Sequence, residues 1–172
     1  MAVRRLRMDK NLIKRDRLRF IKNTASANLA YLAILFNVLY FVSIYSSDPG
    51  NYYYNIEIGV SVIYNLLFLL TAFLSSEGLK GYKKSYAIII IVIGALQLVR
   101  ILGIPMDASS TLMPGTDKYV MDQSQFLYTV IMLVLSSACC ITSGVIGLIR
   151  THQLNDINAK ITSGEVKFEY NK

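Results

Sequence analysis

Charged and amide side chains inside long apolar stretches are the residues of this sequence whose chemistry matters most. Glu57 and Arg100 each lie a few residues from one end of such a stretch, Asn65 lies near the middle of the stretch that holds Glu57, and Asn37 lies near the middle of the stretch before it. A charge at membrane depth is costly unless it finds a partner, and such residues mark either ion pathways or structural pairs. These positions therefore favour polar recognition or ion binding over covalent catalysis.

Helical spacing groups the polar residues into two rows. Residues four apart, or three apart, lie on one face of a helix. The first row recurs every four residues and comprises Glu57, Ser61 and Asn65. The second recurs every three residues and comprises Gly94, Gln97 and Arg100. Each row is expected to face a neighbouring helix.

Matched depth predicts an ion pair between Glu57 and Arg100. Glu57 lies about three residues after the start of its stretch, and Arg100 lies about four residues before the end of its own. Consecutive spans run in opposite directions, and each residue advances a helix by about 1.5 Å, so the two side chains are expected at a similar depth near the same surface. One hypothesis is that the pair fixes the second helix against the third. The other is that both residues line a site for an ion, a proton or a small anion. Asn37 and Asn65 are expected to share a hydrogen bond worth about 1 kcal/mol or less.

Residues typical of enzymes are scarce. His152 is the only histidine and lies near the end of the chain, so neither a histidine-activated nucleophile nor a zinc site is expected. Cys139 and Cys140 are adjacent within an apolar run, which is typical of packing residues and not of a disulfide framework. No glycine-rich phosphate loop is present. We therefore expect no catalytic residue, no metal and no cofactor, and the chain is not expected to be an enzyme.

The elements that carry these residues are predicted from hydrophobicity. Hydrophobic residues make up 53% of the 172 residues and charged residues only 17%, and the mean hydropathy is +0.42. A spanning helix needs about 20 apolar residues. Four windows reach that length, at about 27–46, 54–74, 86–104 and 126–149. The predicted fold is all-α, a transmembrane four-helix bundle, with the residues from 105 to 125 forming a solvated loop.

Basic residues predict the orientation, because Lys and Arg resist translocation. Nine precede the first window, three lie between the second and third, four follow the fourth, and Lys118 stands alone on the opposite side. Both termini are therefore expected in the cytoplasm, in a multi-pass protein of the cell membrane. The predicted organisation is a basic segment at 1–26, a spanning domain at 27–150 and a polar cytoplasmic tail at 151–172.

The two ends are expected to meet lipid or protein partners. In the leading segment Leu6, Ile13 and Phe20 recur every seven residues among basic residues, which is typical of an interfacial helix on the anionic inner leaflet. A docking helix for a cytoplasmic partner is the alternative. The tail is expected to be disordered or laid against another protein. The net charge of +7 does not indicate nucleic-acid binding, because the segments outside the windows are too short for a phosphate-binding domain.

Small residues in the fourth window predict a helix-packing interface. They form two neighbouring rows: Ser136, Cys140 and Gly144, and Ser143 and Gly147. Such rows let two helices approach closely, because association in lipid depends on packing. The partner helix belongs either to this chain or to another protein.

Two runs carry a resemblance. The first extends from Val62-Ile63-Tyr64-Asn65 through Leu74-Ser75-Ser76-Glu77-Gly78-Leu79-Lys80-Gly81-Tyr82, and the second is Ala95-Leu96-Gln97-Leu98-Val99-Arg100. The chain resembles, over most of its length, small uncharacterised four-span membrane proteins of bacteria. The resemblance implies a role beside ABC-type solute importers, particularly those for sugars.

Two functions follow from these observations. The first is an accessory or scaffold subunit that binds a larger membrane complex, with membrane lipids and another membrane protein, or a second copy, as partners. The alternative is a small oligomeric transporter or channel with Glu57, Gln97 and Arg100 near its pathway. Four spans rarely enclose a pathway, so that alternative requires oligomerisation.

Overall fold

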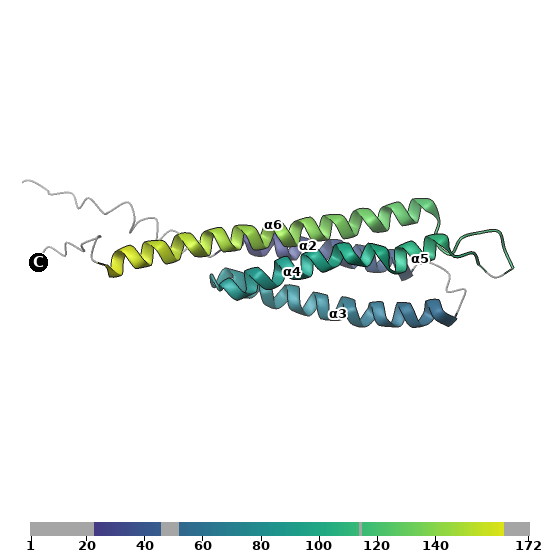
Figure 1. The fold of residues 1–172 in the computed structure, drawn as a ribbon, viewed down its shortest axis with the longest axis horizontal. Helices are drawn as coiled ribbons and strands as arrows, with labels where there is room; N and C mark the ends of the chain where they lie inside the picture. The colour runs from purple at the N-terminus through teal and green to yellow at the C-terminus, as the bar shows by residue number, and fades with distance from the viewer. Residues whose placement is uncertain (1–22, 46–51, 114, 164–172) are drawn as a thin grey trace, which may run out of the picture.

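The protein is all-helical in the residues that the computed structural model describes, which are 23–45, 52–113 and 115–163 (Figure 1). No strand occurs within these ranges. The elements in chain order are α2 (Thr24–Tyr45), α3 (Tyr52–Lys80), α4 (Lys84–Val99), the 3-10 helix η1 (Arg100–Leu102), α5 (Ile104–Ser110) and α6 (Gln123–Thr162). The predicted interfacial helix before Asn23 lies outside the described residues.

Four helical stretches are long and apolar enough to cross a membrane, as the hydrophobic windows predict. They are Thr24–Ile44, Gly59–Lys80, Lys84–Ser110 and Gln123–Lys160. We call the end near the α3–α4 connection the turn end, and the end that holds α5 and residues 111–122 the loop end. The predicted number of helices long and apolar enough to span is confirmed among the described residues, whereas several boundaries differ.

The α3–α4 connection is shorter than the sequence indicates. Residues 75–80 continue α3, and only Gly81, Tyr82 and Lys83 separate it from α4. The N–H groups of Gly81 and Lys83 donate to the carbonyl of Gly78 at 3.1 and 3.2 Å, while Tyr82 takes a left-handed φ of 55°. Gly78 itself remains helical, and the Tyr86 ring packs against it in the place that a side chain would take.

The predicted solvated loop at the loop end is partly wrong. Pro105 has no N–H to donate to the carbonyl four residues earlier, and the α4 geometry gives way to η1 before α5 resumes the helix. Pro105 and Ala108 are buried. Val120 and Met121 are also buried, and Met121 packs in one cluster with Tyr40 and Leu133. These four buried residues therefore close the core, while residues 110–112 and 115–119 are exposed.

The polar tail is also different from the expectation, because α6 continues through it. With 40 residues, α6 is about 60 Å long at 1.5 Å per residue, roughly twice the hydrocarbon thickness. Residues 151–162 belong to this helix and project past the turn end of α3 and α4 (Figure 1). Nothing in this part of the tail is irregular, and residues 164–172 lie outside the described residues.

Hydrogen bonds join α2 to residues 129–150 of α6 in an antiparallel seam. Ser143 Oγ donates to the carbonyl of Ser26 at 2.7 Å, and Ser136 Oγ donates to the carbonyl of Ala33 at 2.9 Å. Nearer the loop end, the hydroxyls of Ser43 and Thr129 lie 2.9 Å apart. At the turn end Arg150 Nη1 donates to Asn23 Oδ1 at 3.0 Å. Small polar residues let the two backbones approach closely, so that their side-chain hydroxyls donate to backbone carbonyls of the neighbouring helix.

The small-residue rows of α6 pack inside this chain, which answers the question left open by the sequence. An ideal Cβ on Gly144 would lie 2.7 Å from the carbonyl oxygen of Ala87 in α4, and one on Gly147 would lie 2.4 Å from Leu79 in α3. Ser137 Oγ donates to the carbonyl of Gly94 at 2.7 Å. α6 is thus the central helix against α2 and α4, and α3 packs on α2 and α4.

Gly144→Ala is expected to destabilise the fold, because the new methyl would meet backbone that cannot turn away. Its ideal Cβ lies 2.4 Å from Ile91 Cγ1 in addition to the Ala87 carbonyl. Overpacking of this kind costs about 1–3 kcal/mol. The loss is measured as a lower midpoint of thermal unfolding in detergent.

Gly59→Ala in α3 is the matched control, since nothing lies within 4 Å of its ideal Cβ. It should be neutral or slightly stabilising, because Ala is the better helix former. Equal midpoints for the two variants would contradict close packing at Gly144.

Candidate functional site

The main polar cluster of the described structure centres on Arg100, where α4 passes into η1. The predicted third span ended at residue 104, about four residues beyond Arg100. The continuation through α5 instead puts Arg100 ten residues before Ser110, the last residue of the apolar stretch. Arg100 is therefore farther from the end of its apolar stretch than expected, and the guanidinium depends on partners from the neighbouring helices.

Four side chains from three helices accept hydrogen bonds from the Arg100 guanidinium. Nη1 donates to Gln97 Oε1 at 2.9 Å in α4, and to Asn37 Oδ1 and Asn65 Oδ1 at 3.1 Å each in α2 and α3. Nη2 donates to Ser61 Oγ at 3.2 Å. Ser61 and Asn65 of the first predicted row therefore meet Gln97 and Arg100 of the second. Gly94 of the second row instead packs against Cys140 and Ile141 of α6.

The amides also bind one another, so that each has a defined orientation. Asn37 Nδ2 donates to Asn65 Oδ1 at 3.0 Å, which is the hydrogen bond expected from their similar depth. Gln97 Nε2 donates to Asn37 Oδ1 at 3.0 Å, and Asn65 Nδ2 donates to the carbonyl of Ser61 at 2.8 Å. Asn37, Asn65 and Gln97 are almost completely buried. Every amide oxygen thus points toward the guanidinium, as a cation requires.

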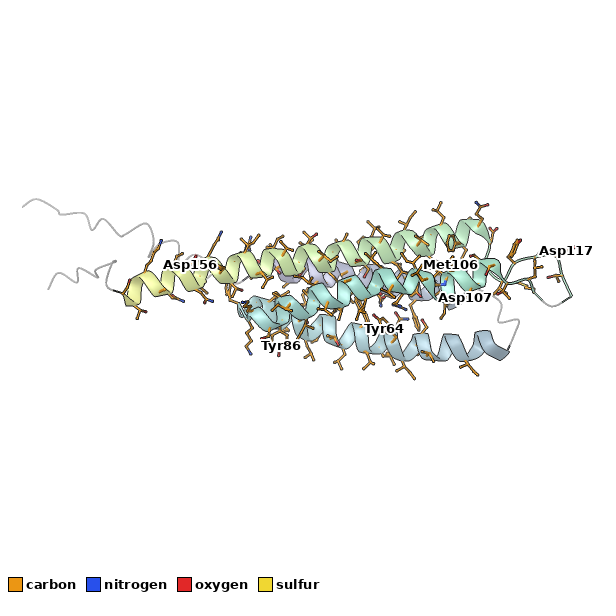
Figure 2. The ribbon with its side chains drawn as sticks, viewed as in Figure 1. Tyr64, Tyr86, Met106, Asp107, Asp117 and Asp156 are labelled. Atoms are coloured by element: carbon orange, nitrogen blue, oxygen red, sulfur yellow. The ribbon has the colours of Figure 1, made fainter. Side chains whose placement is uncertain are left out.

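Two tyrosine rings complete the site, and neither was predicted from the sequence. The Arg100 Cζ lies 4.4 Å from the centre of the Tyr40 ring and 4.5 Å from that of Tyr64. Such stacking attracts a cation to the face of the ring. Figure 2 shows Tyr64 at the α3 side of the α4 ribbon. A signal was present, because Tyr40 lies one turn after Asn37 and Tyr64 directly precedes Asn65.

The cluster can hold a positive charge in an apolar region without a nucleophile or a metal. Its acceptors are neutral oxygens and ring faces, which stabilise a guanidinium but do not cancel its charge. Among the described residues no group of three His, Cys, Asp or Glu side chains could hold a metal ion. The chemistry available here is therefore the binding of a carboxylate or another anion, or the fixing of three helices.

Glu57 is the candidate counter-charge, and its side chain lies outside the described residues. Its backbone is in α3, one helical turn before Ser61. Ser61 accepts from Arg100, so the register of α3 is compatible with a carboxylate beside the guanidinium. The Glu57–Arg100 ion pair remains a prediction.

A second polar set joins α2 to α3 at the turn end. The Tyr31 hydroxyl donates to Glu77 Oε1 at 2.6 Å, and Lys80 Nζ lies 2.5 Å from the same oxygen. Lys80 also donates to the Tyr31 hydroxyl at 3.1 Å. Its charges are paired and partly exposed, which is typical of a structural contact at a helix end.

Asn37→Leu should weaken the fold by about 1–3 kcal/mol, since it leaves the Gln97 amide and the guanidinium short of an acceptor in a buried place. Thermal unfolding in detergent measures this loss. Asn28→Leu is the matched control, because Asn28 lies on the same helix and is exposed. A loss no larger than that of the control would contradict the role given to Asn37.

The predicted ion pair is tested by a double-mutant cycle with Glu57→Gln, Arg100→Gln and the double variant. Paired charges in contact give coupling energies of roughly 0.5–3 kcal/mol. We expect the double variant to lose less stability than the two single losses added together. Additive losses would mean that Glu57 does not pair with Arg100.

Comparison with known proteins does not place this geometry in a family. No family model, no curated protein and no solved structure matches the chain. The resemblance to small four-span bacterial membrane proteins therefore stays a prediction. The candidate site is therefore defined by its geometry alone, as a cationic cluster buried among α2, α3 and α4.

Proposed function

We propose that the protein is a transmembrane four-helix bundle that serves as an accessory or scaffold subunit of a larger membrane complex. In this proposal the turn end and both termini are cytoplasmic, because Lys118 is the only basic residue of the connections at the loop end. Reaction of a Lys118→Cys variant with a membrane-impermeant reagent on intact cells tests the orientation. A solute importer of the ABC type is the complex to which the resemblance points.

The use of polar groups inside the chain supports an interaction role. The small rows of α6 and the amides around Arg100 are all engaged within the protein. The surface of the spanning helices is apolar, with exposed Leu, Ile and Val side chains suited to lipid. A partner that binds through polar or charged side chains must therefore contact the protein outside the apolar stretches.

The observation that carries the proposal is the extension of α6 beyond the spans. We call residues 151–162 the α6 arm; it continues the central helix without a break, so its position is fixed by the packing of α6 against α2 and α4. Its exposed surface is polar and includes His152, Gln153, Asp156 and Lys160. His152 Nδ1 lies 2.9 Å from Asp156 Oδ2, and Figure 2 shows Asp156 on the projecting part of the helix. A rigid polar arm of this kind suits contact with a soluble domain of a membrane partner.

The experiment compares co-purification of the full chain with that of Gln153→Ala/Asp156→Ala/Lys160→Ala. All three side chains are exposed, so the fold should remain intact. After gentle detergent extraction and mass spectrometry, we expect the wild type to retain a defined membrane complex. The amount of partner that co-purifies with the arm variant should be about tenfold lower. That loss corresponds to about 1.4 kcal/mol of binding free energy.

Thr116→Ala/Asp117→Ala at the opposite, loop end is the matched control, and it should retain the complex. Both residues are exposed. Recovery of the chain alone under several mild conditions, or equal retention by the arm variant and the control, would contradict the proposal.

The alternative is a small oligomeric transporter, and the depth of Arg100 is the observation that favours it. Charged residues within spans often mark ion pathways. Arg100 has four acceptors and two ring faces around it. The same surroundings also suit an arginine whose role is only to hold the helices together. Solute flux into liposomes that contain only this protein separates the two functions.

A further inference from the structure

A cavity of about 810 Å³ lies at the loop end, between α5, the following loop and the start of α6. This volume is within the range of small-molecule sites. The cavity is lined by Ser109, Lys118, Tyr119, Met121, Asp122, Gln123 and Phe126. It lies where the apolar stretches Lys84–Ser110 and Gln123–Lys160 end, so a ligand there would meet the boundary between hydrocarbon and water.

The loop that forms one wall is held in place by backbone hydrogen bonds. The N–H of Met121 donates to the carbonyl of Ala108 at 3.0 Å, and the N–H of Val120 donates to that of Thr111 at 2.9 Å. The N–H of Met113 donates to the carbonyl of Lys118 at 2.8 Å. Met121 is almost fully buried beneath the cavity. The walls are therefore formed before any ligand binds.

The cavity brings one positive and one negative side chain together with two aromatic rings. Lys118 is the only Lys or Arg between Arg100 and Arg150, and no described carboxylate forms a salt bridge with it. Asp122 accepts from the Ser124 hydroxyl at 2.6 Å and from the Gln123 N–H at 2.8 Å, and these bonds lower the pKa of Asp122. Asp122 is therefore ionised at neutral pH and retains further lone pairs for a donor.

Apolar side chains lead from the spans to this cavity. Val99, Leu102 and Met106 are 60%, 69% and 54% exposed, and they lie on successive elements, the end of α4, η1 and α5, that lead to Ser109 at the rim. Figure 2 shows Met106 at this end of the molecule. On α6 the exposed Leu127 follows Gln123 by one turn. An acyl chain along these residues would place its headgroup at Lys118 and Asp122.

We propose that this cavity binds the headgroup of a zwitterionic phospholipid that carries a primary amine, with its phosphate at Lys118 and its ammonium at Asp122. A headgroup with net negative charge is disfavoured by Asp122. A quaternary ammonium cannot donate a hydrogen bond to the carboxylate, whereas a primary ammonium has three N–H donors. The combination of one cation, one anion and adjacent apolar surface thus selects the headgroup. This inference is independent of the proposed accessory role.

Native mass spectrometry of the full chain in detergent tests the site with three lipids of identical acyl chains. These are phosphatidylethanolamine, phosphatidylcholine and phosphatidylglycerol. We expect phosphatidylethanolamine to be retained about tenfold better than the other two, as the loss of one charge-assisted hydrogen bond would give. Lys118→Gln should lower retention of all three, and Asp122→Asn should remove the preference while keeping an acceptor at the start of α6.

Asp117→Asn and Lys160→Gln are the matched controls, because both residues are exposed and neither lines the cavity. Equal retention of the three lipids by the wild type, or unchanged retention in Lys118→Gln, would overturn the proposal. Free O-phosphoethanolamine provides the last arm. If it displaces the lipid at equal concentration, the ligand is a soluble zwitterion and the assignment to a lipid is wrong.

Discussion

A guanidinium within an apolar stretch must find its partners inside the protein, and this constraint organises the described structure. Neither the hydrocarbon chains of lipids nor neighbouring aliphatic side chains can accept its hydrogen bonds. Arg100 meets the requirement with Asn37 from α2, Ser61 and Asn65 from α3, and Gln97 from its own helix. Each acceptor reaches the guanidinium only at one rotation of its helix about the helix axis and at one position along that axis. The rotations of α2, α3 and α4 are therefore fixed together by a single side chain.

The fourth helix is fixed by a different mechanism. Between α6 and its neighbours the contacts are made by glycines without a side chain and by hydroxyls that donate to backbone carbonyls across the interface. Dispersion between closely approaching backbones replaces the hydrophobic effect, which does not drive association in an apolar solvent. As a result α6 is held along the part that faces α2 and α4, and the direction of the arm beyond the spans follows from that packing.

Together the two mechanisms leave the interior occupied by the protein's own groups. Functional contact is then expected at the two ends, where α6 projects beyond the turn end and where the cavity at the loop end joins polar and apolar surface. The proposed accessory role uses the first end and the proposed lipid site uses the second. Both are compatible with a chain whose spanning surface is apolar.

The hydrophobic windows alone determined that four helices are long enough to span a membrane, because apolar length is a local property of the chain. Helical spacing also placed Gln97 and Arg100 on one face and Ser61 and Asn65 on another. It did not reveal that Tyr40 and Tyr64 cover the guanidinium, since stacking depends on how three helices are rotated relative to one another.

The helix boundaries were predicted least well, for the same physical reason. Tyr86 fills the space beside Gly78 and α3 continues, and α5 packs where charged and turn-forming residues indicated a loop. The small rows of α6 predicted close packing, yet only the tertiary structure shows that their partners are α2, α3 and α4 of the same chain. A pattern along one helix fixes which face is buried, whereas the identity of the covering surface is a property of the assembled chain.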